Sequence, residues 1–498
     1  MGKVGKVWYD RAMRILVIRP DAIGDVVLMM PLIGSIRRAY PDAEIYTLQQ
    51  PYTIPLTQHH PDIHAVIPDW KKMGSARGLR GFWSYVKHIR GYGFSMVFLP
   101  FNTGYYTALV TLAGIPFRIG DANRVLLSPF LTHRIPQPFR NVMLHETELS
   151  ARLIWAIRPD ISLSSHMHIP VTDAMKHDAE ALMAEHQLIS RRFVIIHPSS
   201  GGGNRMWLRE RYAQLIDELG GKGLQVVLTG ATPDDIQRLA DIRALSQQPV
   251  IDLGGKTSLE ALIGLVYHAR VVVGTDTGPT HIAAALGTPV VSIAPSKFVK
   301  PLRWGPWATP HQVVSHAFSC HLWCKPGCKK PDCLTPIQTD EVVAAIDALW
   351  HHPPAVMVPV DRREWLKHSV SHMVYVTHVA DIPLAMAHVD GLRQWGAEVM
   401  LSTHQHEIRR MMAAHAQLSE RVIHCIPRWQ WWRWCALLIR YDIGCVHLPR
   451  PSRLMRWVRH VSALGQYVPP VMVSLTHPFQ TDAVFMASML KAFDDGHA

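Results

Sequence analysis

The segment from Asp21 to Asp25 places two carboxylates and a glycine directly after an apolar run. Residues 14–19 read as a strand and residues 25–40 as a helix, so the segment lies at the carboxyl end of a strand, where open α/β sheets bind ligands. For Asp25 alone, capping and the helix dipole are the favoured explanation. The Gly-x-Gly-x-x-Gly pattern is missing here, which argues against a dinucleotide-dependent oxidoreductase.

A glycine-rich loop follows the strand expected at residues 193–198 and precedes the helix expected at 210–219. The loop contains Ser199, Ser200, Gly201 and Arg205. Free backbone N–H groups beside a cation suit a pyrophosphate, and a guanidinium can hold phosphate oxygens with two hydrogen bonds. A glycine-rich turn without a ligand explains this segment equally well when it is taken alone.

A second loop leaves the strand expected at residues 271–274 and opens a helix expected at 280–286. It carries Asp276, Thr277, Gly278, Thr280 and His281. Exposed N–H groups, hydroxyls and an imidazole converge there at one helix N-terminus, and the aspartate is placed to accept hydrogen bonds from hydroxyls of a sugar or of an acceptor. A capping turn is the alternative, but so many small and hydroxyl-bearing residues favour a ligand.

Glu260 lies in the first turn of a helix expected to begin at about residue 259. Ser258 or Thr257 can cap this helix. The helix dipole explains the carboxylate, and a hydrogen bond to a ribose is the alternative. Taken alone, the segment favours the structural explanation.

Four cysteines, Cys320, Cys324, Cys328 and Cys333, fall within 14 residues. In a reducing compartment this density suggests a tetrahedral structural zinc site. The spacing differs from the paired C-x2-C of zinc ribbons and from common iron–sulfur spacings. Free thiols and two disulfides stay open as alternatives.

Strands alternate with helices, and the alternation restarts twice, which predicts parallel, doubly wound α/β sheets. Residues 1–170 and 171–354 are each expected to form one Rossmann-like domain, and residues 355–498 a partial α/β unit. The expected strands of this last unit are 372–378, 398–402, 421–426, 444–448 and 471–475.

The amino-acid composition excludes some classes of protein and favours some partners. The 498 residues, 48% of them hydrophobic and 18% charged, exclude global disorder. A formal charge of +12 favours anionic partners, but a nucleic acid is not expected because no recognition motif accompanies the charge. No apolar run reaches the roughly 18 residues of a membrane-spanning helix, and no signal peptide is recognised. The seven cysteines then favour a reducing cytoplasm.

Together these motifs resemble glycosyltransferase family 9, the ADP-heptose:lipopolysaccharide heptosyltransferases, over about residues 14–350. The resemblance depends on the order and spacing of ILVIRPDAIGDVVLMMPL, FRIG, HETE, HPSSGGGNRMW and SLEALIGLVYHARVVVGTDTGPTHIAAALGTPVVSI. It implies the GT-B architecture, two Rossmann-like domains that face each other across a cleft, and an inverting transfer. Residues 441–448 and 471–477 resemble the N-terminal domain of family 4 glycosyltransferases.

The resemblance implies roles for single residues. Asp25 falls on the family's GD motif and would be the general base. Arg205 falls where many members have a lysine on the donor diphosphate, and Glu260 on a motif near the donor nucleoside. Residues 276–281 fall on the motif around the diphosphate and sugar. No cofactor is implied for catalysis.

The expected reaction is the inverting transfer of a heptose from ADP-heptose to a lipopolysaccharide-core acceptor. The acceptor would be a lipid-anchored, phosphorylated saccharide, and the enzyme would be peripheral on the cytoplasmic face of the inner membrane. The basic residues at 3–14 and the segment RWQWWRW at 428–434 fit an anionic surface, although a packed helix edge explains the latter equally well. Another nucleotide sugar or glycan acceptor, and a non-catalytic scaffold in envelope polysaccharide assembly, are the alternatives.

Overall fold

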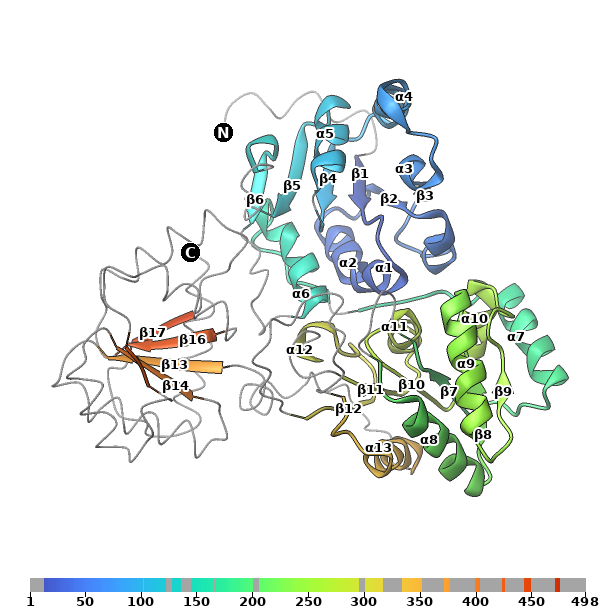
Figure 1. The fold of residues 1–498 in the computed structure, drawn as a ribbon. Coiled ribbons are helices and arrows are strands. Elements are labelled where there is room, and N and C mark those ends of the chain that lie inside the picture. The colour runs from blue at the N-terminus through green and yellow to red at the C-terminus, as the bar shows by residue number, and fades with distance from the viewer. Residues whose placement is uncertain are drawn as a thin grey trace. The chain divides into compact units, whose positions relative to one another are not determined.

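The computed structural model describes residues 13–101, 103–121, 128–135, 145–164, 166–199, 206–294, 301–316 and 334–351, and five strands between 371 and 474 (Figure 1). The chain divides into two compact units. The first holds residues 1–137, 145–316 and 326–359, and the second holds 138–144, 317–325 and 360–498. Among the described residues, no helix is both long and apolar enough to cross a bilayer.

Six parallel strands form the first sheet, in the order β3-β2-β1-β4-β5-β6. Its strands are β1 (Arg14–Ile18), β2 (Glu44–Gln49), β3 (Ala65–Pro68), β4 (Met96–Leu99), β5 (Phe117–Asp121) and β6 (His133–Ile135). Its connections hold α1 (Ile23–Leu28), α2 (Met30–Ala39), η1 (Pro51–Leu56), α3 (Trp70–Met73), α4 (Gly78–Gly91), α5 (Gly104–Leu112) and η2 (Ser128–Phe130), and α6 (Glu146–Ala151) and η3 (Arg152–Ala156) follow its last strand. The apolar runs in β1 and β4 are buried, as expected for strands covered by helices on both faces.

The second sheet repeats this topology, with six parallel strands in the order β12-β11-β10-β7-β8-β9. Its strands are β7 (Phe193–His197), β8 (Gln225–Leu228), β9 (Ile251–Asp252), β10 (Val271–Gly274), β11 (Val290–Ile293) and β12 (His311–Val314). Its helices are α7 (Asp173–Glu185), α8 (Arg209–Gly221), α9 (Pro233–Leu245), α10 (Leu259–His268), α11 (Gly278–Ala285), α12 (Pro301–Trp304) and α13 (Thr339–His351). In both sheets the strand order reverses next to the first strand, and ligands of such sheets bind at that point.

The second unit contains a third parallel sheet, in the order β15-β14-β13-β16-β17. Its strands are β13 (Ser371–Val376), β14 (Val399–Thr403), β15 (Ile423–Cys425), β16 (Ile443–Leu448) and β17 (Val471–Ser474). All five overlap the strands expected from the sequence. The expected α/β class, with two doubly wound six-stranded sheets in the first unit, is confirmed.

One apolar cluster joins the two sheets of the first unit. It includes Ile15 and Val27 from the first sheet and its helices, and Ile195, Val272 and Ile282 from the second. All five side chains are fully buried. The two halves of this unit therefore share a continuous core rather than meeting only through polar surfaces.

The helix expected at residues 25–40 is two helices, because the chain breaks at Met29 between α1 and α2. Pro31 lies in the first turn of α2, where its missing N–H costs no helical hydrogen bond. The first helix also begins two residues earlier than expected, at Ile23. Ala22 is the N-cap, so Asp25 is the third residue of the first turn and its side chain does not serve as the cap.

Candidate active site

Arg19 lies directly after β1, and its side chain is only 3% exposed. Its Nη2 donates to Oδ1 of Asp25 at 2.5 Å, and its Nε lies 3.3 Å from Oδ2 of Asp21. Burial alone would lower the pKa of Arg19, but the carboxylates of Asp25, Glu146 and Asp21 outweigh it and raise the pKa. Arg19 is therefore a fixed buried cation around which the acidic side chains are arranged.

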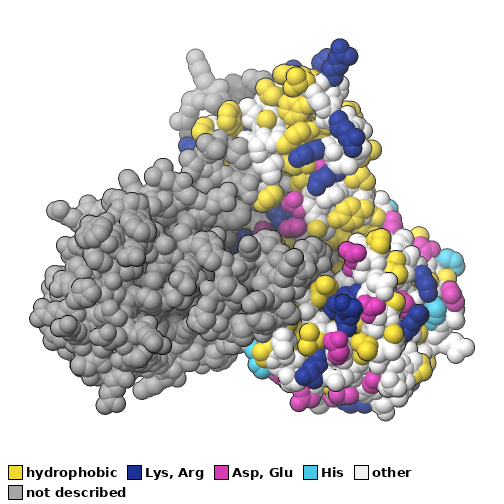
Figure 2. Space-filling view, viewed as in Figure 1, with side chains coloured by type: hydrophobic (Ala, Val, Ile, Leu, Met, Phe, Trp, Pro, Cys, Tyr) yellow, Lys and Arg dark blue, Asp and Glu magenta, His cyan; other side chains and the backbone are white. Residues whose placement is uncertain are grey.

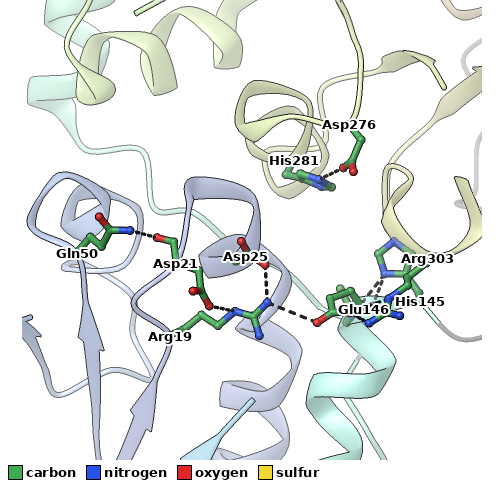
Figure 3. Close-up of polar contacts among 10 residues, drawn as sticks. Arg19, Asp21, Asp25, Gln50, His145, Glu146, Asp276, His281 and Arg303 are labelled. Carbon is green, nitrogen blue, oxygen red and sulfur yellow. Dashed lines mark hydrogen bonds and ion pairs between the residues drawn. The ribbon is translucent and has the colours of Figure 1, made fainter. Parts of the chain in front are cut away.

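Asp25 presents one carboxylate oxygen to this cation and keeps the other available. The side chain is 26% exposed, and Oδ2 makes no hydrogen bond within the described part of the chain. Figure 3 shows Asp25 on α1 above the Arg19 guanidinium. The contact with Arg19 orients a partly exposed acceptor oxygen, which is the arrangement a general base needs.

Asp21 supports the same cluster from the turn before α1. Its backbone oxygen accepts from Nε2 of Gln50 at 2.9 Å, which ties the loop after β1 to the loop after β2. Burial raises the pKa of Asp21, while Arg19 acts to lower it. The sequence predicted no role for Asp21 beyond the turn, because its contact with Arg19 depends on the path of the chain after β1.

In the half of the first unit that contains the second sheet, hydroxyl groups of the loop after β10 hold that loop in place. The Thr277 N–H donates to Oγ1 of Thr280 at 3.2 Å, and that hydroxyl lies 2.7 Å from the Thr277 carbonyl oxygen and 3.0 Å from that of Thr275. The hydroxyl of Thr275 reaches the carbonyl oxygen of Ser199 at 3.2 Å. The two loops predicted to bind the donor, after β7 and β10, thus lie against each other.

Asp276 and His281 form a hydrogen-bonded pair at the start of α11 (Figure 3). His281 Nε2 lies 2.8 Å from Oδ1 of Asp276. Because an ionised carboxylate only accepts, Nε2 carries the proton and donates it. Nδ1 of His281 is buried and has no partner among the described residues. Asp276 remains partly exposed, with 18% of its side chain accessible.

Two glycines bring α1 and α11 into direct contact. A Cβ placed on Gly24 would lie 2.7 Å from Cδ2 of His281, and one on Gly278 would lie 2.8 Å from Cγ2 of Ile23. Each helix therefore buries a side chain against a glycine of the other. Gly24, the residue before Asp25, therefore lies against the imidazole ring of His281.

We expect Gly24→Ala to reduce stability and activity, because the added methyl group must displace the buried His281 ring. Overpacking of this kind costs about 1–3 kcal/mol of unfolding free energy. The matched control is Gly221→Ala at the end of α8, where a Cβ would meet nothing within 4 Å. Urea unfolding and turnover of both variants check the prediction; equal stability of the two would show that α1 and α11 do not pack this closely.

Glu146, the first residue of α6, connects the Arg19 cluster to the second sheet's half. Its Oε1 accepts from Arg19 Nη2 at 3.4 Å, and its Oε2 accepts from Nε and Nη2 of Arg303 at 3.1 and 2.9 Å. The carboxylate is buried, with 9% of the side chain exposed. Arg19, Glu146 and Arg303 were not predicted from the sequence, in which the HETE motif that contains Glu146 was the one available signal.

His145 caps α6 and reaches the same half of the unit. The Thr147 N–H donates to its Nδ1 at 3.2 Å, so Nε2 carries the proton and donates to the Gly305 carbonyl oxygen at 2.9 Å. The ring also lies against Trp307, with centroids 4.5 Å apart. Burial lowers the pKa of His145 to about 3.

The buried neutral His145 makes stability pH-dependent. Between pH 6.5 and about 3 the unfolded chain binds a proton that the folded chain does not, so stability falls as the pH falls. At about pH 5 the loss is about 2 kcal/mol from this residue. We expect His145→Gln to be less stable than the wild type at neutral pH but to lose less on acidification.

Urea unfolding at about pH 7.5 and 5 measures both differences. Some pH dependence will remain in the variant, because burial also lowers the pKa of His60 and of His197 to about 4. An unchanged loss between the two pH values would contradict the assignment.

Glu260 lies in the first turn of α10, and Ser258 caps that helix as expected, its Oγ accepting from the Ala261 N–H at 3.0 Å. Glu260 is half-buried, and its carboxylate makes no hydrogen bond or ion pair within the described residues. The remaining predicted positions, Ser200, Gly201, Arg205, Cys320, Cys324, Cys328 and Cys333, lie outside the described residues, as do 1–12 and 428–434. The structural zinc and the roles of these residues stay predictions.

The sequence profile of glycosyltransferase family 9 (heptosyltransferase) matches residues 82–337, more than half of the chain. The chain belongs to glycosyltransferase family 9. Lipopolysaccharide heptosyltransferase 3 of Escherichia coli is 27% identical over 293 residues, which cover 57% of this chain and 84% of that protein.

Solved structures agree on the fold. A family 9 glycosyltransferase from Veillonella parvula has a TM-score of 0.57 and 20% identity, and covers 68% of this chain and 97% of its own. The E. coli ADP-heptose lipopolysaccharide heptosyltransferase II has a TM-score of 0.54 and 22% identity, and covers 68% of this chain and 98% of its own. The chain is thus a glycosyltransferase with the GT-B-like architecture of this family, as the sequence predicted.

Proposed function

We propose that this family 9 glycosyltransferase transfers a heptose from ADP-heptose to a lipopolysaccharide-core acceptor with inversion, and that Asp25 is the general base. The free Oδ2 of Asp25, on a helix packed against the Asp276–His281 loop, is the observation that carries the proposal. A base on α1 and a loop suited to a sugar diphosphate then lie where α1 packs against α11. The similarity to E. coli lipopolysaccharide heptosyltransferase 3 supports the choice of heptose and of acceptor class.

The reaction is a single displacement. The acceptor hydroxyl oxygen attacks the anomeric carbon, its proton passes to Oδ2 of Asp25, and the bond from that carbon to the diphosphate oxygen breaks to release ADP. Arg19 holds Oδ1 throughout, so the base approaches in a fixed orientation. Inversion follows because the attacking and leaving oxygens lie on opposite sides of the anomeric carbon.

The leaving diphosphate gains charge as that bond breaks. In the first turn of α11 the N–H groups of Gly278 and Thr280 have no acceptor within the helix, while Pro279 has no N–H, and this end of the helix would stabilise an anion. Arg205, in the loop after β7, would add a cation there, and the free carboxylate of Glu260 would accept from ribose hydroxyls. Asp276, whose side chain is partly exposed, would bind a hydroxyl of the transferred sugar. The step requires no metal ion.

The acceptor in this proposal is a lipid-anchored, phosphorylated saccharide, and the enzyme acts as a peripheral protein on the cytoplasmic face of the inner membrane. Another nucleotide sugar or another envelope glycan is the second candidate, and a non-catalytic scaffold is the third. The oriented Asp25 argues against a scaffold, because a protein that only binds has no need of a carboxylate oxygen kept free beside a buried arginine.

A panel of nucleotide sugars separates these candidates. We expect ADP-heptose at a hundred times its Kd to raise the unfolding free energy by about 2.7 kcal/mol, and the GDP- and UDP-sugars to have little effect. Thermal unfolding and single-turnover assays with each sugar measure the two consequences. Equal stabilisation by GDP- or UDP-sugars would overturn the choice of donor, and no response to any nucleotide would favour the scaffold.

A further inference from the structure

The segment from Trp70 to Gly120 contains no acidic residue. It contains seven cations: Lys71, Lys72, Arg77, Arg80, Lys87, Arg90 and Arg118. The chain as a whole has 51 Lys and Arg against 39 Asp and Glu, so a run of this length without any carboxylate departs strongly from the average composition. The first six cations lie on α3, on α4 or on the turn between them.

Helix α4 carries large apolar side chains on both its inner and its outer face. Its inner face is buried through Tyr85, Val86 and Ile89. Its outer face also carries large apolar side chains: Leu79 is 80% exposed and Trp83 is 48% exposed. An exposed leucine next to an exposed tryptophan on a helix with a satisfied core face is not explained by folding, because both would be more stable buried.

Two cations, Arg80 and Lys87, lie on that same outer face, and Arg77 directly precedes the helix, with its guanidinium beside Gly74. Leu79, Trp83 and Lys87 follow at intervals of four residues, and Arg80 lies three residues before Trp83, so all four share one side of the helix. Arg77, Arg80 and Lys87 are exposed and make no ion pair with any described residue. Figure 2 shows dark blue and yellow side chains gathered where Figure 1 draws α3 and α4. We call Leu79, Arg80, Trp83 and Lys87, together with Arg77 at the start of the helix, the α4 face.

We propose that the α4 face binds the surface of an anionic lipid bilayer. The guanidinium and ammonium groups would contact lipid phosphates, while Leu79 and Trp83 would enter the boundary between headgroups and acyl chains, where tryptophan is favoured. Charge complementarity supports this occupant over a neutral surface, because the face has unpaired cations and the surrounding segment has no acid to oppose them. Its mixture of cations and exposed apolar groups is typical of helices that lie in the plane of an interface.

The inference rests on the proposed function, because membrane binding at the α4 face would bring the site to a lipid-anchored acceptor. It differs from the sequence-based expectation, which assigned membrane contact to residues 3–14 and 428–434. The α4 face belongs to the same sheet and helices as Asp25, so contact there would hold the acceptor half of the enzyme at the membrane.

Vesicle sedimentation of the full chain tests the proposal. Wild-type protein should bind vesicles of phosphatidylglycerol and phosphatidylethanolamine but not of phosphatidylcholine, and about 0.5 M salt should release it. Arg77→Ser/Arg80→Ser/Lys87→Ser should lower the partition coefficient roughly a hundredfold, since each cation contributes roughly fivefold. Leu79→Ser/Trp83→Ser should lower it roughly tenfold or more through lost apolar burial.

The matched control is Ile189→Ser/Arg192→Ser, which removes a 57% exposed isoleucine and an exposed arginine from the other half of the unit. It should bind like the wild type. Equal binding by the wild type and both α4 variants, or equal binding to neutral and anionic vesicles, would overturn the proposal. Turnover with a lipid-free acceptor is measured in parallel, so that loss of the proposed activity and loss of membrane binding are distinguished.

Discussion

Asp25→Asn should lower kcat by about 10²–10⁴-fold, the usual contribution of a general base, while the donor Kd stays within about threefold. The amide keeps the size of the side chain and one oxygen for Arg19, so the helix and the guanidinium should stay in place. The amide nitrogen that replaces Oδ2 cannot take a proton from the acceptor hydroxyl. The loss therefore belongs to the chemical step rather than to donor binding.

Single-turnover kinetics and calorimetric titration with ADP separate chemistry from binding. Asp42→Asn is the matched control, because Asp42 is exposed in the turn after α2 and should tolerate the same substitution. Donor binding that collapses while the rate per bound complex stays near the wild-type value would show that Asp25 holds the donor instead of acting as the base.

Glu146→Gln should be the most destabilising conservative substitution at the site. It leaves two arginines without the carboxylate that joins them, and removing one partner of a buried ion pair costs about 3 kcal/mol or more. We also expect kcat to fall roughly tenfold to a hundredfold, because Arg19 would no longer fix Asp25 and small displacements of a reacting group are costly. Glu146 is thus a positioning residue.

A double-mutant cycle with Arg303→Gln measures the connection directly. The double variant should cost less than the sum of the two single variants, with a coupling of about 0.5–3 kcal/mol. Asp160→Asn, which breaks the exposed pair with Arg158, is the control and should cost about 1 kcal/mol at most. Additive losses for Glu146 and Arg303, with unchanged kcat in folded protein, would rule out the positioning role.

The sheets were predictable because apolar strands in parallel sheets are continuous runs, such as β1, β7 and β10. The five strands of the third sheet were predicted in the same way. Helix α4 was missed. Glycines at 78, 81 and 91 lower helix propensity, and the exposed Leu79 and Trp83 obscure the apolar stripe that marks a buried face.

The candidate site was predictable only where function leaves a local pattern. The loops after β1 and β10 stand at strand ends and contain glycine and carboxylates, so Asp25 and Asp276 could be named from the sequence. Glu146 lies 127 residues from Arg19 and 157 from Arg303, and no local pattern predicts contacts at such separations. The same holds for Gly24 and His281, whose contact requires both halves to be folded and packed.

The hydroxyl groups of Thr275, Thr277 and Thr280 have a thermodynamic consequence for the loop that opens α11. They fix its backbone before any ligand arrives, so the loss of conformational entropy, about 1–2 kcal/mol per residue, accompanies folding of the chain rather than ligand binding. A nucleotide sugar that binds there meets a preorganised loop. Its binding free energy is then reduced little by the entropic cost of ordering the loop.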